Sequence, residues 1–250
     1  MAEDKAIVLI TGANGGIGFA LAALLMADPH KHVLVGSRSA EKGQRALADL
    51  QQQGLPGSVE LVVLDVASDE SILAAAKQVE AGHGRLDALV NNAAIGSPEG
   101  SRAEGMARCF QTNATGPYLM VEAFAPLLKK STRTPRIINV TSGAGSVARR
   151  MDPNGPSYNL GMWGIQYGAS KAAMNLITAY QAVVYGEQGI KVFAFSPGFV
   201  ASNLGAHNTV ENGAQETSVG AAPMVGIIDG ERDAELPRNG FLRASGQSPW

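Results

Sequence analysis

The chain has 250 residues, and its 20 lysines and arginines against 22 aspartates and glutamates leave a formal net charge of −2. That balance excludes the excess of basic residues with which proteins neutralise a nucleic acid backbone. The single cysteine, Cys109, excludes an internal disulfide and every multi-cysteine metal site. With 45% hydrophobic and 17% charged residues, the composition predicts a globular chain, and we expect one domain over residues 1–250.

Apolar runs in the chain are all much shorter than the roughly 20 residues that a membrane-spanning helix needs. The first residues lead directly into a strand-like run, without the apolar segment and cleavage site of a signal peptide. We therefore expect a cytoplasmic protein with no membrane partner.

Short apolar, β-rich runs recur along the chain and alternate with helical stretches. Because these runs are continuously apolar, they suit strands that are covered on both faces. The pattern predicts an α/β fold with a doubly wound, mostly parallel sheet and helices on both faces. The predicted strands cover residues 6–10, 33–35, 59–64, 86–90, 136–140, 190–195 and 240–242.

Two segments interrupt this alternation. Residues 143–166 hold glycine, proline, asparagine, methionine and tryptophan, and residues 201–222 are rich in asparagine, glycine, alanine and serine. Long irregular segments in a compact domain usually carry function. We predict that both are loops that form the walls of a substrate pocket.

A glycine-rich turn follows the first predicted strand and opens the first helix, with the sequence Thr11-Gly12-Ala13-Asn14-Gly15-Gly16-Ile17-Gly18. Glycines let the backbone approach a pyrophosphate closely, and a helix N-terminus supplies free N–H groups and partial positive charge. The glycine spacing differs from the common dinucleotide fingerprint, and a plain strand-to-helix turn is the structural alternative.

Arg38 follows the second predicted strand, where a dinucleotide site contacts the adenosine ribose. A carboxylate at this place would bind the 2′-hydroxyl, whereas an arginine accommodates a 2′-phosphate. Here Ser37, Arg38 and Ser39 precede the first carboxylate, Glu41. The residues favour NADP(H) over NAD(H), the alternative being a solvated arginine.

Tyr167 and Lys171 lie four residues apart in a predicted helix, so their side chains share one side of it. A free tyrosine has a pKa near 10, and a neighbouring ammonium lowers it toward a value useful for proton exchange. Ser142 follows the fifth predicted strand, at the sheet edge where ligands of such folds bind. Together the three residues predict an acid/base site.

These motifs resemble those of the short-chain dehydrogenase/reductase superfamily over essentially the whole chain, and the closing residues resemble its carbonyl-reductase-like members. The resemblance implies a seven-stranded Rossmann-type sheet and a nicotinamide cofactor. It is carried by Thr11-Gly12, Gly16 and Gly18, by Asp65, by Asn91-Asn92-Ala93-Ala94, by Asn113 to Gly116, by Ser142, by Tyr167 and Lys171, by Pro197-Gly198, and by Gly240-Phe241-Leu242 with Pro249-Trp250.

The resemblance also implies four catalytic roles. Tyr167 would protonate the forming alkoxide, Lys171 would lower the Tyr167 pKa and hold the nicotinamide ribose, Ser142 would hydrogen-bond the carbonyl oxygen, and Asn113 would order a water. The implied cofactor-binding residues are Gly12, Asn14, Gly15, Gly16, Ile17, Gly18, Ser37, Arg38, Asp65, Val66, Asn92, Ala93, Tyr167, Lys171, Pro197, Gly198, Val200 and Ser202.

Two departures from the family pattern affect the expected pocket. Ala94 replaces the usual glycine and adds a methyl group near the nicotinamide. The stretch between Ser142 and Tyr167 is longer than is common in the family, and we expect its extra residues to form part of the pocket wall, the alternative being a surface excursion. Those residues are Met151, Pro153, Pro156, Tyr158, Met162 and Trp163.

The histidines show no metal-ligand spacing, so we predict no metal site and read His30, His32, His83 and His207 as surface residues. Cys109 is predicted to be a buried thiol without a chemical role.

The favoured function is NADPH-dependent reduction of a small ketone or aldehyde, reversible as alcohol oxidation. A cofactor-bound cyclase or dehydratase of a specialised biosynthetic pathway and a non-catalytic NADP(H) redox sensor remain alternatives. Small residues on the Tyr167 helix, with Tyr180 and Tyr185, favour a homodimer or homotetramer. A monomer is the alternative, with the longer Ser142–Tyr167 stretch masking that helix face.

Overall fold

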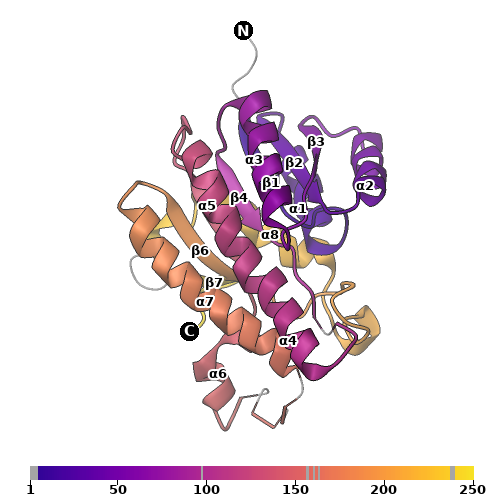
Figure 1. Ribbon diagram of the computed structural model, residues 1–250, viewed down its shortest axis with the longest axis vertical. Coiled ribbons are helices and arrows are strands. Elements are labelled where there is room, and N and C mark those ends of the chain that lie inside the picture. Colours follow the sequence, from indigo (N-terminus) through magenta and orange to yellow (C-terminus); the bar gives the residue numbers. More distant parts are fainter. Residues whose placement is uncertain (1–4, 97, 156–157, 160, 163, 237–239) are drawn as a thin grey trace.

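The computed structural model describes residues 5–250 except 97, 156–157, 160, 163 and 237–239. Its centre is a sheet of seven strands in the order β3-β2-β1-β4-β5-β6-β7, in which every neighbouring pair is parallel (Figure 1). The strands are β1 (Ala6–Ile10), β2 (Lys31–Ser37), β3 (Ser58–Val63), β4 (Ala88–Asn91), β5 (Arg136–Val140), β6 (Lys191–Ser196) and β7 (Phe241–Arg243). The predicted doubly wound, Rossmann-type fold is confirmed.

Helices cover both faces of the sheet, as its continuously apolar strands require. They are α1 (Gly16–Met26), α2 (Ala40–Gln52), α3 (Asp69–His83), α4 (Arg102–Phe110), α5 (Gly116–Leu128), α6 (Val147–Met151), α7 (Ile165–Gly186) and α8 (Thr217–Ile228). Four shorter turns of helix are η1 (Gln111–Thr115), η2 (Gly143–Gly145), η3 (Val210–Asn212) and η4 (Asp233–Glu235).

The buried side chains form two clusters, one on each face of the sheet. On one face Leu21 and Leu25 of α1 pack with Met224 and Ile227 of α8. On the other face α3 and α5 bury an apolar stripe that includes Phe124, which is fully enclosed. The two layers hold the strands so that all their carboxyl ends meet at one edge.

The order of the strands reverses between β1 and β4, since β1 is followed in the chain by β2 on one side and pairs with β4 on the other. In open α/β sheets, such a switch point opens a crevice at the carboxyl ends of the strands. The glycine-rich turn after β1 and residues Asn92 and Ala93 after β4 lie at this point.

Both predicted loop segments contain helix. Segment 201–222 runs into α8 at Thr217, and segment 143–166 contains η2, α6 and the start of α7. The helix propensity of α8 is lowered by Gly220, Pro223 and Gly226, so the sequence pattern did not predict this helix. Tertiary packing against α1 compensates for that propensity.

The carboxyl-terminal residues fold back over the start of the 143–166 segment. The Ser146 hydroxyl donates to the Pro249 carbonyl at 2.7 Å, and the Ala148 amide donates to the Trp250 carbonyl at 3.1 Å. Among the residues that the structure describes, no helix has the length and apolar character needed to cross a membrane.

Candidate active site

A cavity of about 370 Å³ opens at the carboxyl edge of the sheet, and all the predicted site residues except Gly18 and Asn113 line it. Its lining residues come from the ends of β1, β2, β3, β4, β5 and β6 and the turns after them, from the first turns of α2 and α7, and from η1. The structure therefore brings together residues that the sequence places far apart.

Thr11 fastens the glycine-rich turn to the end of β4. Its side-chain oxygen accepts the backbone N–H groups of Asn92 and Ala93, each at 3.0 Å. The side-chain nitrogen of Asn92 in turn donates to the Thr11 carbonyl at 2.9 Å. Thr11 was noted only as part of a motif in the sequence, and the structure gives it a positioning role at this turn.

Two glycines of the turn are required by close contacts. Gly12 has φ +64°, and a Cβ there would lie 2.9 Å from the Ala93 Cα. A Cβ on Gly18 would lie 2.6 Å from the Asn92 side-chain nitrogen, although Gly18 does not itself line the cavity. The glycines thus let α1 start directly against β4, which directs its N-terminal N–H groups into the cavity.

Cationic groups gather where the cavity passes the end of β2. Arg38 and Lys42 both line it, and among the described residues neither side chain forms a hydrogen bond or an ion pair. Ser37 is buried and its hydroxyl donates to the Ser39 carbonyl at 2.9 Å. Lys42 was missed in the sequence, although its place four residues after Arg38, in a helix capped by Ser39, could have indicated it.

The middle of the cavity is formed by the ends of the inner strands. Asp65 accepts the Ala67 amide at 2.9 Å through one carboxylate oxygen, and Val66 is buried beside it. Ala94, the departure from the family pattern, also lines the cavity. On the far side lie Pro197, Gly198, Val200 and Ser202, together with Asn203, Leu204 and Asn208 of the 201–222 segment, which were not named individually from the sequence.

Ser142, Tyr167 and Lys171 converge on the same cavity. Ser142 caps η2, and its hydroxyl oxygen accepts the backbone N–H of Ala144 at 3.1 Å. Tyr167 and Lys171 stand one turn apart on α7, with the Lys171 Nζ 5.7 Å from the centre of the tyrosine ring. The Lys171 Nζ donates to the Val140 carbonyl at 2.8 Å. The predicted juxtaposition of the three residues is therefore present.

Burial is the largest cause of the pKa shifts of both Tyr167 and Lys171. It raises the pKa of Tyr167 to about 12, and the hydrogen bond with Ser142 opposes that rise only in part. Burial also lowers the pKa of Lys171 to about 8. The expectation that Lys171 lowers the pKa of Tyr167 stays a prediction.

Asn113 lies behind the catalytic residues, in the π-helical turn η1 that joins α4 to α5. It is fully buried, and its side chain exchanges hydrogen bonds with the backbone N–H and C=O of Ile95, both at 2.9 Å. It also donates to Ser170 of α7 at 2.9 Å. π-Helical turns are frequent at functional sites, and this one connects α7 to the strand end after β4.

Buried amides and hydroxyls hold α7 in place over the sheet. Asn139 of β5 accepts from Asn91 of β4 at 2.8 Å and donates to Thr178 and Gln181 of α7 at 2.9 and 2.8 Å. One turn closer to the cavity, Thr141 donates to Asn175 at 2.6 Å. These bonds fix the position of Tyr167 and Lys171 relative to the strand ends.

The longer Ser142–Tyr167 stretch is expected to form part of the pocket wall, and that expectation stays a prediction. None of the described residues in segment 143–166 lines the cavity, and Met151, Tyr158 and Met162 are 69, 47 and 75% exposed. The packing of Ser146 and Ala148 against the chain terminus draws the segment away from the cavity. Pro156 and Trp163 lie outside the described residues.

Three smaller sequence-based expectations can also be compared. Cys109 is buried as predicted, and its thiol donates to the Gly96 carbonyl at 3.3 Å. His32 and His83, in contrast, are half-buried beside Glu60 rather than at the surface, and burial lowers the pKa of His32. Tyr185, expected at a helix face open to a partner, is buried and donates to Glu122 at 2.6 Å.

Comparison with known proteins agrees with this geometry. The family model for short chain dehydrogenases matches residues 6–212. The short-chain dehydrogenase/reductase eupG of a Phoma species is 34% identical, with 100% of this chain and 99% of that protein covered. The short-chain dehydrogenase anuI of Penicillium roqueforti is 39% identical, with 90 and 88% covered.

Solved structures are similar over the same length. The NADPH-bound carbonyl reductase from chicken fatty liver is 29% identical, with a TM-score of 0.79, and 98% of this chain and 99% of that chain are covered. A metagenomic short-chain oxidoreductase in complex with NADP is 28% identical, with a TM-score of 0.68, and 89 and 90% are covered.

Proposed function

Because the chain belongs to the short-chain dehydrogenase family, we propose that it uses NADP(H) to reduce the carbonyl group of a small ketone or aldehyde, reversibly. Membership of that family makes it an oxidoreductase. One observation carries the finer proposal: Ser142, Tyr167 and Lys171 face the same cavity as the glycine-rich turn and the cations Arg38 and Lys42.

The residues at the end of β2 fit a phosphorylated adenosine ribose. Two side-chain cations, Arg38 and Lys42, border the cavity there without a partner among the described residues. An arginine pairs well with a 2′-phosphate, whereas an NAD site would place a carboxylate on the 2′-hydroxyl. The NADPH and NADP complexes of the two similar structures support the same assignment.

The rest of the cavity fits the remaining parts of the dinucleotide. The α1 N-terminus and the glycine-rich turn offer backbone N–H groups to a pyrophosphate. Lys171 lines the same cavity as Asn92 and Ala93, which supports its proposed role of holding the nicotinamide ribose. Pro197, Gly198, Val200 and Ser202 form the opposite wall, toward which the nicotinamide carboxamide would point.

The bound cofactor supplies a hydride to the carbonyl carbon. The chain's own residues supply the proton and the orientation. Ser142 donates a hydrogen bond to the carbonyl oxygen, and Tyr167 gives that oxygen the proton that completes the alcohol. Burial favours this role, because a phenol with a raised pKa of about 12 holds its proton at neutral pH until an alkoxide of higher basicity forms beside it.

A panel of ketones and aldehydes tests the proposal, with NADPH consumption followed by the absorbance of the reduced nicotinamide. We expect turnover of at least one carbonyl compound and formation of the matching alcohol. Tyr167→Phe is the control variant. NADPH binding without turnover of any carbonyl, and without oxidation of any alcohol by NADP⁺, would contradict the proposal and favour a redox sensor.

For the assembly we propose a homodimer or homotetramer that forms through α7. Leu176, Tyr180 and Val183 on its outer face are 61, 69 and 66% exposed. A row of large exposed apolar groups on one helix suits a symmetric interface. Light scattering at micromolar concentration measures the mass, and a value near the 25.9 kDa of one chain would contradict this assembly.

A further inference from the structure

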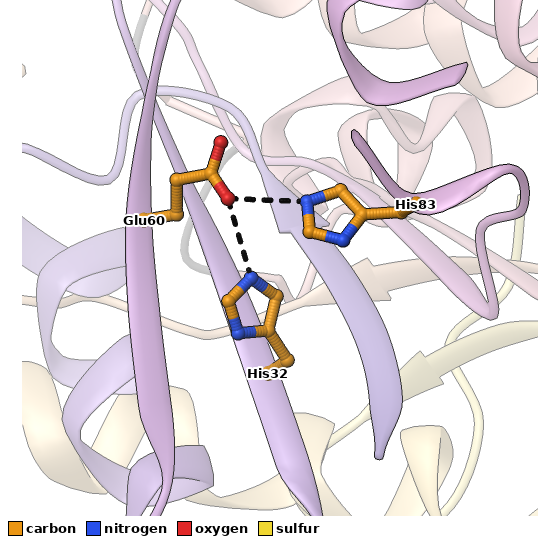
Figure 2. A group of neighbouring side chains, drawn as sticks. All are labelled: His32, Glu60 and His83. Atoms are coloured by element: carbon orange, nitrogen blue, oxygen red, sulfur yellow. Dashed lines mark hydrogen bonds and ion pairs between the residues drawn. The ribbon is translucent and has the colours of Figure 1, made fainter. Parts of the chain in front are cut away.

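Two histidines and a glutamate meet at the edge of the sheet far from the cavity. Figure 2 shows His32 of β2, Glu60 of the neighbouring edge strand β3 and His83 at the end of α3, with both imidazole rings directed at one carboxylate oxygen. The Glu60 Oε2 lies 3.1 Å from the His83 Nε2 and 3.5 Å from the His32 Nε2. The two rings are 4.9 Å apart, centre to centre.

One nitrogen of this cluster has no hydrogen bond. Among the described residues, the His32 Nε2 is buried and meets Glu60 only as an ion pair at 3.5 Å. The other ring nitrogen, Nδ1, lies 2.7 Å from the Ser58 hydroxyl, which fixes the orientation of the ring. Buried polar nitrogens rarely remain unpaired in folded proteins. The Nε2 therefore points to an occupant between the three side chains.

We infer that His32, Glu60 and His83 bind one divalent transition-metal ion of the Zn²⁺ type. The three ligand atoms lie within 4.8 Å of one another. Tetrahedral zinc with bonds of about 2.0–2.2 Å holds its ligands roughly 3.4 Å apart, so small side-chain movements complete the geometry. Imidazole nitrogens with one carboxylate select zinc and similar metals over Mg²⁺ or Ca²⁺.

The surroundings of the cluster match such a site. The Ser58 contact to the His32 Nδ1 is the kind of hydrogen bond that orients a metal-binding imidazole. His83 ends α3, where the partial negative charge of the helix C-terminus favours a cation. Lys5 opposes the metal charge, but its Nζ contacts the Ser58 hydroxyl at 3.4 Å, on the Nδ1 side of the ring. The Glu60 side chain is 42% exposed, which leaves a fourth position open to water.

A metal ion bound there would stabilise the folded chain and would take no part in the reaction at the cavity. The site joins the edge strand β3, the strand β2 and the end of α3 at the amino ends of the strands, whereas the cavity lies at the carboxyl ends. An ion that binds the folded chain and not the unfolded chain raises the unfolding temperature. We therefore expect Zn²⁺ to stabilise the protein without changing its affinity for NADPH.

The test is a calorimetric titration of Zn²⁺ into the full chain after treatment with a chelator. We expect one Zn²⁺ per chain, and an affinity reduced at least about tenfold in His32→Ala, His83→Ala and Glu60→Gln, in line with the loss of a ligand or its support. His30→Ala is the matched control, since His30 is exposed and lies outside the cluster. Mg²⁺ in place of Zn²⁺ should give no saturable binding.

A second measurement tests the inference even if one of the variants folds poorly. Co²⁺ in the wild-type site should show the intense visible absorption of tetrahedral cobalt, which Glu60→Gln and His83→Ala should lose while they still bind NADPH. Zn²⁺ binding that is as tight in both histidine variants as in the wild type would overturn the inference. So would the absence of binding to the wild type at one ion per chain.

Discussion

The glycine-rich turn and the segment between Ser142 and Tyr167 both border the active-site region, but they are built in opposite ways. In the turn, Gly12 could not carry a Cβ without meeting the Ala93 backbone, and Thr11 anchors two amides of the neighbouring strand end. In the segment, Met151 and Met162 are mostly exposed and line no part of the cavity. Geometry thus dictates the residue type at Gly12 and leaves it free at the exposed Met151 and Met162.

The largest effect is expected at Tyr167, in the first turn of α7. Tyr167→Phe removes only the hydroxyl, so general acid catalysis is lost and carbonyl reduction should fall by about 10²–10⁴-fold. NADPH affinity, measured by fluorescence titration, should stay nearly unchanged. Retention of more than about a tenth of the wild-type rate would show that another group protonates the alkoxide.

Gly12→Ala should be the most damaging backbone change in the turn. The alanine must adopt φ +64° and meets the Ala93 Cα at 2.9 Å. The left-handed conformation alone costs about 1–2 kcal/mol, and the contact adds to it. Gly161→Ala is the matched control in the other region, because Gly161 has φ +54° with nothing within 4 Å. Urea unfolding and NADPH titration should show a clear loss for Gly12→Ala, and equal losses for both variants would remove the distinction between the regions.

The burial of Lys171 on α7 can be tested through the pH dependence of stability. Its pKa falls from 10.5 in the unfolded chain to about 8 in the folded one, so between these values the unfolded chain binds more protons and wild-type stability rises with pH. Lys171→Met cannot titrate. The free energy of unfolding of the variant relative to wild type should therefore decline as pH rises from 8 to 10, by at most about 1.4 kcal/mol per pH unit. Urea unfolding at both pH values measures it. A constant difference would place the ammonium in solvent rather than in the interior.

Arg38→Ala should reduce the preference for NADPH over NADH by about tenfold in kcat/KM, the usual size of a lost hydrogen bond to a charged group. Lys42→Ala should reduce it less, since a lysine lacks the paired geometry of a guanidinium. Kinetics with both cofactors measure the ratio. A wild type that uses NADH as efficiently as NADPH would contradict the assignment of this end of the cavity.

Met162→Ser should have the smallest effect. Its side chain is 75% exposed and lines no part of the cavity, so the free energy of unfolding should change by less than about 0.5 kcal/mol. NADPH affinity should be the same as in wild type. A loss of NADPH affinity as large as that of Gly12→Ala would erase the contrast between the two regions.

The same contrast explains what the sequence could predict. The glycine-rich turn, Ser142, Tyr167 and Lys171 could be placed because each type follows from its position beside a strand end or on one helix face. Helix α8 was hidden because packing, not propensity, stabilises it. The cluster of His32, Glu60 and His83 left no sequence spacing to recognise, because three separate elements bring its members together only in the folded chain.

The bonds from Asn139 to Thr178 and Gln181 have a consequence for how this protein can change. Sliding α7 along the sheet by one turn, about 5.4 Å, would leave these buried amides and hydroxyls unpaired, at about 1–3 kcal/mol for each group. Smaller shifts of α7 would break the same hydrogen bonds without offering other partners. The helix is therefore held in one position along the sheet. The surface segments that flank α7 can therefore accept insertions and substitutions without moving the Tyr167 hydroxyl away from the strand ends. New substrate preferences can then arise at the periphery while the proton donor stays where it is.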